Sequence, residues 1–198
     1  MKAEWLKYKL YVFDLDDTLY RETDYLFAAY GRIGAYLAGG DAVKAQEYTR
    51  FLCDSFMQEG RQELFQRLSD RYKLDVPIEE ILGILRSTAC PLEMYEPMRQ
   101  VLDELLQAGK QVVILTNGNP QQQQQKITNL RLAHLYPRIE IVYAASIAPK
   151  PSPETLLQLM SAHHADAAQT VLIGDSETDR QTALNAGTDY IEACYLTK

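Results

Sequence analysis

The sequence has little of several features that mark particular classes of protein. It contains only three cysteines, Cys53, Cys90 and Cys194, and no Cys-x-x-Cys pair. An odd number of widely separated cysteines fits neither a disulfide framework nor a zinc cluster, so we expect reduced thiols. The sequence also has no run of about 18 apolar residues, so it shows no sign of a membrane-spanning helix.

An excess of positive charge is also lacking, because 20 lysines and arginines stand against 27 aspartates and glutamates. The formal net charge is −7, whereas proteins that bind nucleic-acid polymers or anionic membranes need a positive surface. We expect neither partner, although a bound metal ion would still let a small phosphorylated substrate approach. The first residues lack the long apolar stretch of a signal peptide, so the expected location is the cytoplasm.

What the sequence does contain is the pattern of an α/β protein of ordinary composition, with 46% hydrophobic and 24% charged residues. Its 198 residues suffice for one core domain with a smaller satellite. Short apolar runs that predict buried strands lie at residues 10–13, 112–115, 139–143 and 171–173. Amphipathic patterns that predict helices lie at 98–106, 153–160 and 177–186. The alternation predicts a Rossmann-like, doubly wound parallel sheet with helices on both faces.

Residues 20–92 break this alternation, because their apolar residues recur only at helical spacing. Within this segment, Gly39-Gly40-Asp41 can close one helix and cap the next. We therefore predict a small all-α subdomain over residues 20–92, inserted into an α/β core formed by residues 1–19 and 93–198. The glutamine run at 121–125 is predicted to belong to a helix that starts at Asn119-Pro120, and it is given no function of its own.

The strongest chemical signal is Asp14-Leu15-Asp16-Asp17-Thr18, directly after the first predicted strand. Side chains two residues apart on an extended backbone project to the same side, so Asp14 and Asp16 can face one cleft. Carboxylate oxygens at a strand end are ligands that Mg²⁺ accepts. Taken alone, the pentapeptide could also be a solvated acidic turn.

Two further loops follow strands and carry polar groups. Thr116, Asn117 and Gly118 follow the second apolar run, where a hydroxyl and exposed backbone N–H groups can bind phosphate oxygens. Taken alone, these three residues fit a simple turn as well. Lys150 lies between two prolines in a stiffened loop, and taken alone it fits a solvated surface lysine.

FDLDDTL, LTNG, the lysine of KPSPE and GDSETD occur in this order at or after the predicted strands. Together they resemble the four motifs of the haloacid dehalogenase superfamily. The resemblance covers essentially the whole chain, and the helical insert looks like the cap that one large branch of that superfamily carries after its first strand. It implies a magnesium-dependent phosphatase that passes through an aspartyl-phosphate intermediate.

The resemblance also implies a role for each motif residue. Asp14 would be the nucleophile and Asp16 the general acid and base, with Lys150 as the third catalytic residue. Thr116, Asn117 and Gly118 would bind the substrate phosphate.

The implied cofactor is Mg²⁺, and its ligands would come from the first and fourth motifs. Asp14, Asp16 and Asp175 would hold the ion, Asp16 through its backbone carbonyl. Asp179 would orient the site or the lysine.

Other activities stay open at this point. A phosphosugar mutase of the same superfamily retains both first-motif aspartates, and a non-catalytic phospho-ligand-binding protein keeps the same fold. Dehalogenases and phosphonate hydrolases are disfavoured, because they usually lack the second acidic residue, here Asp16.

The substrate is the least specified expectation. The stretch LTNGNPQQQQQKI resembles the branch that includes nucleoside 5'-monophosphatases. Tyr20, Tyr25, Phe27 and Tyr30 could stack on a base if they are exposed. Sugar phosphates and other small phosphomonoesters stay open beside nucleoside monophosphates, and nothing in the sequence indicates an oligomeric state.

Overall fold

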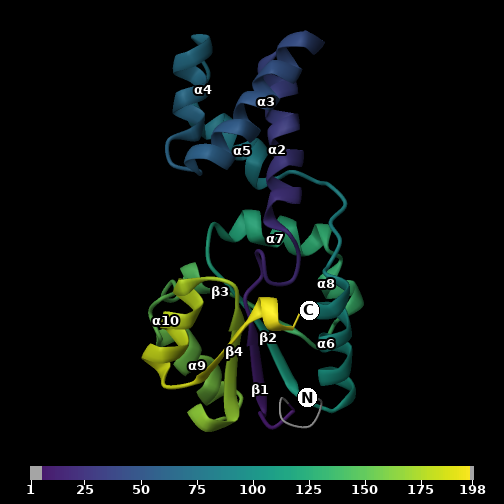
Figure 1. The fold of residues 1–198 in the computed structure, drawn as a ribbon, viewed down its shortest axis with the longest axis vertical. Coiled ribbons are helices and arrows are strands. Elements are labelled where there is room, and N and C mark those ends of the chain that lie inside the picture. The colour runs from purple at the N-terminus through teal and green to yellow at the C-terminus, as the bar shows by residue number, and fades with distance from the viewer. Residues whose placement is uncertain (1–5, 197–198) are drawn as a thin grey trace. The chain divides into compact units, whose positions relative to one another are not determined.

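The computed structural model describes residues 6–196, and the chain divides into two compact units (Figure 1). One unit contains the chain up to Arg21 and from Leu92 onward, and the other is Glu22–Pro91. These bounds lie close to the predicted ones at residues 19–20 and 92–93. The role of the helical unit as a cap stays a prediction.

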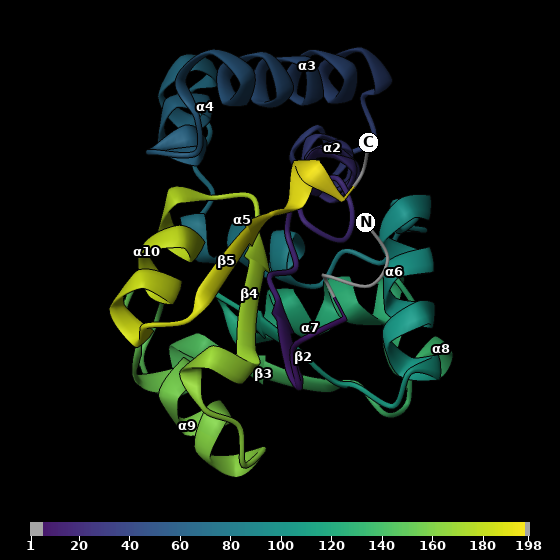
Figure 2. The same cartoon turned by 60° about the horizontal axis from the view of Figure 1, so that its bottom comes forward.

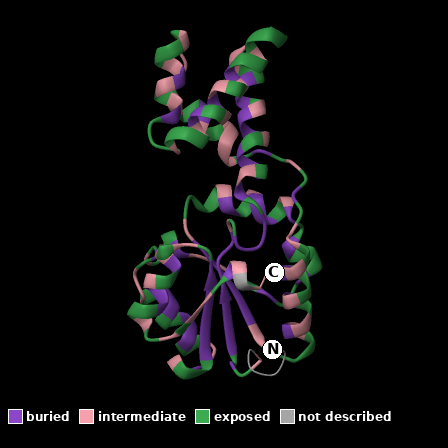
Figure 3. Ribbon diagram, viewed as in Figure 1, coloured by how far each residue is buried: buried purple, intermediate pink, exposed green. Residues whose placement is uncertain are grey.

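The larger unit is built on a five-stranded parallel sheet in the order β3-β2-β1-β4-β5. The strands are β1 (Leu10–Phe13), β2 (Gln111–Thr116), β3 (Glu140–Tyr143), β4 (Thr170–Gly174) and β5 (Asp189–Glu192). Every residue of the central β1 and of β4 is buried (Figure 3). A strand covered on both faces needs a continuous apolar run, which is what the sequence supplies there.

Helices cover both faces of this sheet (Figures 1 and 2). They are α6 (Glu96–Gln107), α7 (Pro120–Asn129), α8 (Leu132–Leu135), α9 (Glu154–Ala162) and α10 (Glu177–Ala186). Short 3-10 helices lie at Ala144–Ser146, Ala167–Gln169 and Ala193–Tyr195. In both views α9 and α10 lie on one side of the sheet, and α6 and α8 lie on the other. The predicted Rossmann-like, doubly wound sheet is confirmed.

One apolar core cluster lies between the sheet and the helices α9 and α10. Leu156 and Leu159 of α9 and Ala183 of α10 share one apolar core cluster with buried strand side chains. The strand members are Leu10, Val12, Val113, Leu115 and Leu172. Alternate residues of each strand thus face the same helices. This close packing makes the sheet a rigid support for the loops at the carboxyl ends of its strands.

The strand β5 was not predicted. Its four residues, Asp189-Tyr190-Ile191-Glu192, are exposed or only partly buried, as expected for the edge of a sheet. An edge strand needs no continuous apolar run, so the periodicity of this segment gave no strand signal. Its pairing with β4 is what defines it.

The smaller unit is entirely helical in the described structure, as the sequence predicts. Its helices are α2 (Glu22–Leu37), α3 (Ala42–Glu59), α4 (Leu64–Tyr72) and α5 (Ile78–Arg86). Asp41 caps α3, because its carboxylate accepts the backbone N–H groups of Val43 and Lys44 at 3.0 and 3.1 Å. Across residues 6–196, no helix is long and apolar enough to cross a membrane.

The helices α2 and α3 approach each other most closely at a glycine. A Cβ placed on Gly34 would lie 2.7 Å from the carbonyl oxygen of Ala45 and 2.3 Å from the hydroxyl of Thr49. Gly31 lies on the same helix, and a Cβ there would meet nothing within 4 Å. The two glycines therefore differ in their effect. Gly34 allows α2 and α3 to cross closely, whereas Gly31 only lowers the helix propensity of α2.

Alanine substitutions at these two glycines should act in opposite directions. Gly34→Ala should lower the free energy of unfolding by about 1–3 kcal/mol, because a backbone atom of α3 must move. Gly31→Ala should leave it unchanged or raise it by up to about 1 kcal/mol through better helix propensity. Urea unfolding followed by circular dichroism measures both, and equal effects would show that the crossing is not tight at Gly34.

Candidate active site

The carboxyl ends of β1, β4 and β2 bring the predicted motifs to one edge of the sheet. Asp14 directly follows β1, and its backbone N–H donates to the carbonyl of Ile173 in β4 at 2.8 Å. Asp175 directly follows β4, and Thr116 is the last residue of β2. The chain turns away after Asp14 through Asp17, whose φ of 52° lies in the left-handed region.

Lys150 lies between two buried carboxylates. Its Nζ atom is 2.5 Å from Oδ1 of Asp14 and 2.5 Å from Oδ1 of Asp179. The side chains of Lys150 and Asp179 are 3% and 1% exposed, so these charges interact with little screening by water. Two buried carboxylates would repel each other, and the ammonium between them makes their approach possible.

Asn117 fixes the loop that carries this lysine. Its side-chain Oδ1 accepts the backbone N–H of Lys150 at 2.9 Å, and its Nδ2 donates to the carbonyl of Lys150 at 3.0 Å. The side chain of Asn117 thus holds the lysine loop, and the prediction that the backbone N–H groups of this turn bind phosphate stays a prediction. Thr116 is buried, and Gly118 has a φ of 98° that lets the chain turn into α7.

Burial dominates the electrostatics of the site. It raises the pKa of Asp14 to about 7, with the neighbouring Lys150 ammonium opposing the rise and Asp179 adding to it. Burial alone would lower the pKa of Lys150, but Asp14 and Asp179 outweigh it and raise that pKa above its ordinary value. The pKa of Asp175 is also raised, by burial and then by the charges of Asp179 and Asp17.

Three carboxylates form a group that can hold a metal ion. Asp14, Asp175 and Asp179 each offer an oxygen, and these oxygens lie within 4.8 Å of one another. A set made only of carboxylate oxygens fits a hard divalent cation such as Mg²⁺ or Ca²⁺, and a bound cation would relieve the desolvation that raises the pKa values. Thr18 steadies Asp175 with a hydroxyl donated at 3.2 Å to its Oδ1.

This group differs from the predicted one at one side chain. The sequence predicted Asp14, Asp175 and the backbone carbonyl of Asp16 as ligands, with Asp179 in an orienting role. The carboxylate of Asp179 contacts Lys150 through one oxygen and Ser176 through the other, because the Ser176 Oγ donates to its Oδ2 at 2.5 Å. The carboxylate of Asp16 points to other residues.

Asp16 is held by α7 and by a tyrosine. Lys126 Nζ lies 2.8 Å from both carboxylate oxygens, Gln123 donates to Oδ2 at 2.8 Å, and the Tyr20 hydroxyl donates to Oδ1 at 2.6 Å. The sequence did not single out Lys126 or Gln123. Their spacing of three on the helix that begins after Thr116-Asn117-Gly118 places them on one face, which is the signal that could have found them.

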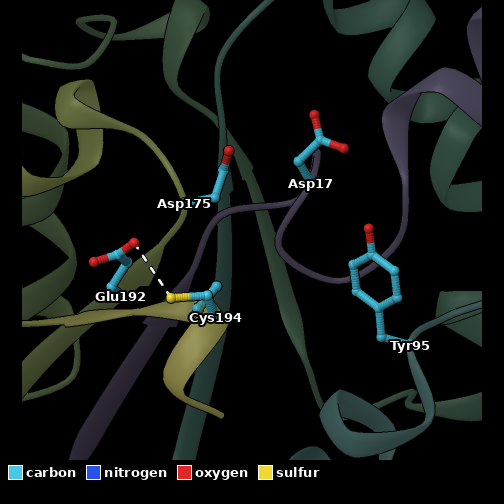
Figure 4. A pocket seen from close by; sticks show the side chains of 6 residues that line it. Asp17, Tyr95, Asp175, Glu192 and Cys194 are labelled. Atoms are coloured by element: carbon cyan, nitrogen blue, oxygen red, sulfur yellow. Dashed lines mark hydrogen bonds between the residues drawn. The ribbon is translucent and has the colours of Figure 1, made fainter. Parts of the chain in front are cut away.

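A pocket of about 260 Å³ opens beside this cluster. It is lined by Asp17, Asp175, Tyr95, Glu192 and Cys194, together with Ala193 (Figure 4). The thiol of Cys194 donates to Oε1 of Glu192 at 3.3 Å, and Cys53, Cys90 and Cys194 are not joined in disulfides. Asp175 therefore lines this pocket together with Glu192, the last residue of β5.

Comparison with known proteins identifies the family. Residues 11–193 match the model of the haloacid dehalogenase-like hydrolase family. The chain belongs to this family. The match spans all the motifs described above, and so the resemblance inferred from the sequence is confirmed.

Curated relatives of this family member are phosphoglycolate phosphatases. The one from Aliivibrio fischeri is 30% identical over 95 residues, which are 48% of this chain and 41% of the relative. The one from Caulobacter vibrioides is 36% identical over 95 residues, covering 44% of this chain and 37% of the relative. The chain thus aligns with less than half the length of these relatives.

Solved structures of the family share the fold. A haloacid dehalogenase-like hydrolase from Xanthomonas campestris is 25% identical, with a TM-score of 0.60, and the match covers 94% of this chain and 81% of that one. A protein from Thermotoga maritima described as a β-phosphoglucomutase is 14% identical, with a TM-score of 0.69 and coverage of 96% of both chains. The hydrolase YfnB from Bacillus subtilis, solved with magnesium, is 21% identical with a TM-score of 0.60, covering 93% of this chain and 87% of that one.

The position of Lys150 between Asp14 and Asp179 leads to a prediction about stability. Lys150→Met should lower the free energy of unfolding in chelator by about 3 kcal/mol or more, because two carboxylates stay buried without their shared cation. Adding Asp14→Asn to Lys150→Met should restore part of this loss by removing one charge. Thermal and urea unfolding measure both variants, and a double variant less stable than Lys150→Met would contradict the arrangement.

Proposed function

We propose that this protein is a magnesium-dependent phosphomonoesterase that acts on a small phosphorylated metabolite through a phosphoryl group held covalently on Asp14. The observation that carries this proposal is the environment of Asp14: a carboxylate at the carboxyl end of the central strand, 2.5 Å from Lys150 and within a group of carboxylates suited to a divalent cation. The family membership and the curated phosphatase relatives support it.

In the first half-reaction, an oxygen of Asp14 attacks the phosphorus of the substrate, and the bond from phosphorus to the ester oxygen breaks. Protonated Asp16 gives its proton to the leaving alcohol. In the second half-reaction, the now ionised Asp16 takes a proton from water. The oxygen of that water attacks the phosphorus of the aspartyl-phosphate, and the bond from phosphorus to the Asp14 oxygen breaks. Inorganic phosphate leaves, and both residues return to their starting states.

The other motif residues stabilise the negative charge of the transferring group. The Lys150 ammonium faces Asp14, and the hydroxyl of Thr116 and the backbone N–H groups of the Asn117-Gly118 turn lie after the neighbouring strand. Asp14, Asp175 and the backbone carbonyl of Asp16 would hold Mg²⁺, with Asp179 close enough to join them. The bound ion would supply positive charge that neutralises the phosphoryl oxygens.

The substrate is proposed to be a small phosphomonoester, with nucleoside 5'-monophosphates as one candidate class beside sugar phosphates. The aromatic residues named for base stacking give this class no added support. Tyr20 is fully buried and donates to Asp16, and Tyr25 is fully buried with its hydroxyl on the carbonyl of Leu85. Tyr30 is buried as well, and only Phe27 keeps substantial exposure, at 36%.

Activity assays test the proposal directly. Purified protein with magnesium should release inorganic phosphate from at least one class of small phosphomonoester, and chelation should stop the release until magnesium is restored. Asp14→Asn should lower kcat by about 10³-fold or more while the protein stays folded, because the substitution keeps the shape and removes the nucleophile. Asp189→Asn, at an exposed aspartate at the opposite end of the strands, is the matched control and should keep wild-type activity.

The products decide between the alternatives. Release of free phosphate supports the phosphatase, whereas an isomerised sugar phosphate without free phosphate would support a mutase. Binding of phosphorylated compounds without any turnover would support a non-catalytic role. Unchanged activity in a verified Asp14→Asn preparation would refute the covalent mechanism.

Metal binding should depend on pH because of Asp14. Burial raises its pKa to about 7, so below this pH the carboxyl carries a proton that a metal ion must displace. The apparent dissociation constant for Mg²⁺ should therefore rise as the pH falls from 8 to 6, by up to about tenfold per pH unit below 7. Calorimetric titrations measure it. Asp14→Asn should lose this dependence. A wild-type affinity for Mg²⁺ that does not change between pH 8 and pH 6 would contradict the role of Asp14 as a metal ligand.

A further inference from the structure

Lys126 is a buried charged residue that the mechanism above does not use. It lies on α7, its residue is only 1% exposed, and its Nζ contacts both oxygens of Asp16 at 2.8 Å. Gln123, one turn earlier on the same helix, is 3% exposed. Burying a lysine and a glutamine on the face of a helix is costly unless they are partnered, and the partner they share is Asp16.

The carboxylate of Asp16 receives hydrogen bonds on both oxygens. Lys126 contacts both, Gln123 donates to Oδ2 at 2.8 Å, and Tyr20 donates to Oδ1 at 2.6 Å. Asp16 itself lies on the turn after β1, next to Asp17 with its left-handed backbone. A side chain in a loop has little positional restraint of its own, so the placement of this carboxylate depends on these donors, of which Lys126 and Gln123 lie on the regular helix α7.

Gln123 also contacts the loop predicted to bind phosphate. The same Nε2 atom lies 2.6 Å from the hydroxyl oxygen of Thr116 and 2.8 Å from the carbonyl oxygen of Asn117. One buried amide thus joins the acid and base residue to the phosphate-binding turn. A shift of Gln123 would therefore move Asp16 and the Thr116-Asn117 turn relative to each other.

We propose that Lys126 and Gln123 are positioning residues that fix the carboxylate of Asp16 in place for its proton transfers, an inference that rests on the proposed phosphatase function. They do not touch the phosphoryl group in this reaction scheme, and they act through Asp16. Loss of either residue should therefore reduce the step that needs proton donation to the leaving group more than the steps that do not.

Leaving groups of different basicity separate this role from a structural one. An alkyl phosphate releases an alkoxide that needs a proton from Asp16, whereas 4-nitrophenyl phosphate releases a stable phenolate that does not. Lys126→Met should lower kcat/KM for an alkyl phosphate substrate about 10²-fold or more, the range of general acid catalysis. It should lower kcat/KM for 4-nitrophenyl phosphate less than about tenfold and leave KM nearly unchanged. Lys126→Arg should restore part of the loss.

A double-mutant cycle tests whether the effect passes through Asp16. In an Asp16→Asn background, Lys126→Met should cause no further loss of kcat/KM for the alkyl phosphate, because the positioned group is already gone. Gln123→Leu should show the same pattern with a smaller loss, and it serves if Lys126→Met does not fold. Gln121→Leu, at an exposed glutamine of the same helix, is the matched control and should behave as wild type.

The outcomes separate this inference from the function on which it rests. Wild-type protein that releases no phosphate from either substrate overturns the proposed function, and the inference with it. Active wild-type protein whose Lys126→Met and Asp16→Asn losses multiply overturns the inference alone. Equal losses on alkyl and nitrophenyl phosphates in folded variants also overturn it, because they would mark a purely structural role.

Discussion

The ammonium of Lys150 between Asp14 and Asp179 is the interaction on which the rest of the site depends. Desolvation raises the pKa of a buried carboxyl, and two such groups side by side would favour the protonated form, which is a poor nucleophile. A cation 2.5 Å from each opposes this effect. The paired hydrogen bonds of Asn117 to the lysine backbone and the hydrogen bond of Ser176 to Asp179 help to hold the three groups together. Two loops and the first turn of α10 thus contribute to one contact.

The parallel sheet explains why loops so distant in sequence can meet. The strand β1 lies between β2 and β4, and the chain reaches both neighbours only after long connections. All strands run in the same direction, so the residues after β1, β2 and β4 emerge at one edge. The buried strands form a rigid base for these loops. The close approach at Gly174, where a Cβ would lie 2.5 Å from the carboxyl group of Asp179, shows how tightly that edge is packed.

The sequence predicted the strands that are buried and the residues that follow them, because continuous apolar runs ending in polar residues carry both signals. It did not predict β5, whose partly exposed residues have no such run. It did not predict that the Asn117 side chain holds the Lys150 loop, and it gave no role to Gln123 in the glutamine run or to Lys126 directly after it. Lys126 and Asp16 are 110 residues apart in the sequence, and their contact joins α7 to the turn after β1. No local pattern in a single sequence predicts a contact between residues so far apart. Helical periodicity could predict which face of α7 is buried, but it could not predict that this face contacts Asp16.

The central claim is that Asp14 carries the phosphoryl group during turnover. The most direct measurement is to mix the wild-type protein with magnesium and 4-nitrophenyl phosphate, quench in acid within milliseconds, and locate any phosphoryl group by mass spectrometry of the peptides. We expect a phosphoryl group on Asp14 whose amount follows the initial release of nitrophenol, and none in Asp14→Asn. Nitrophenol release at wild-type rate with the phosphoryl group on another side chain, or on none, would contradict it.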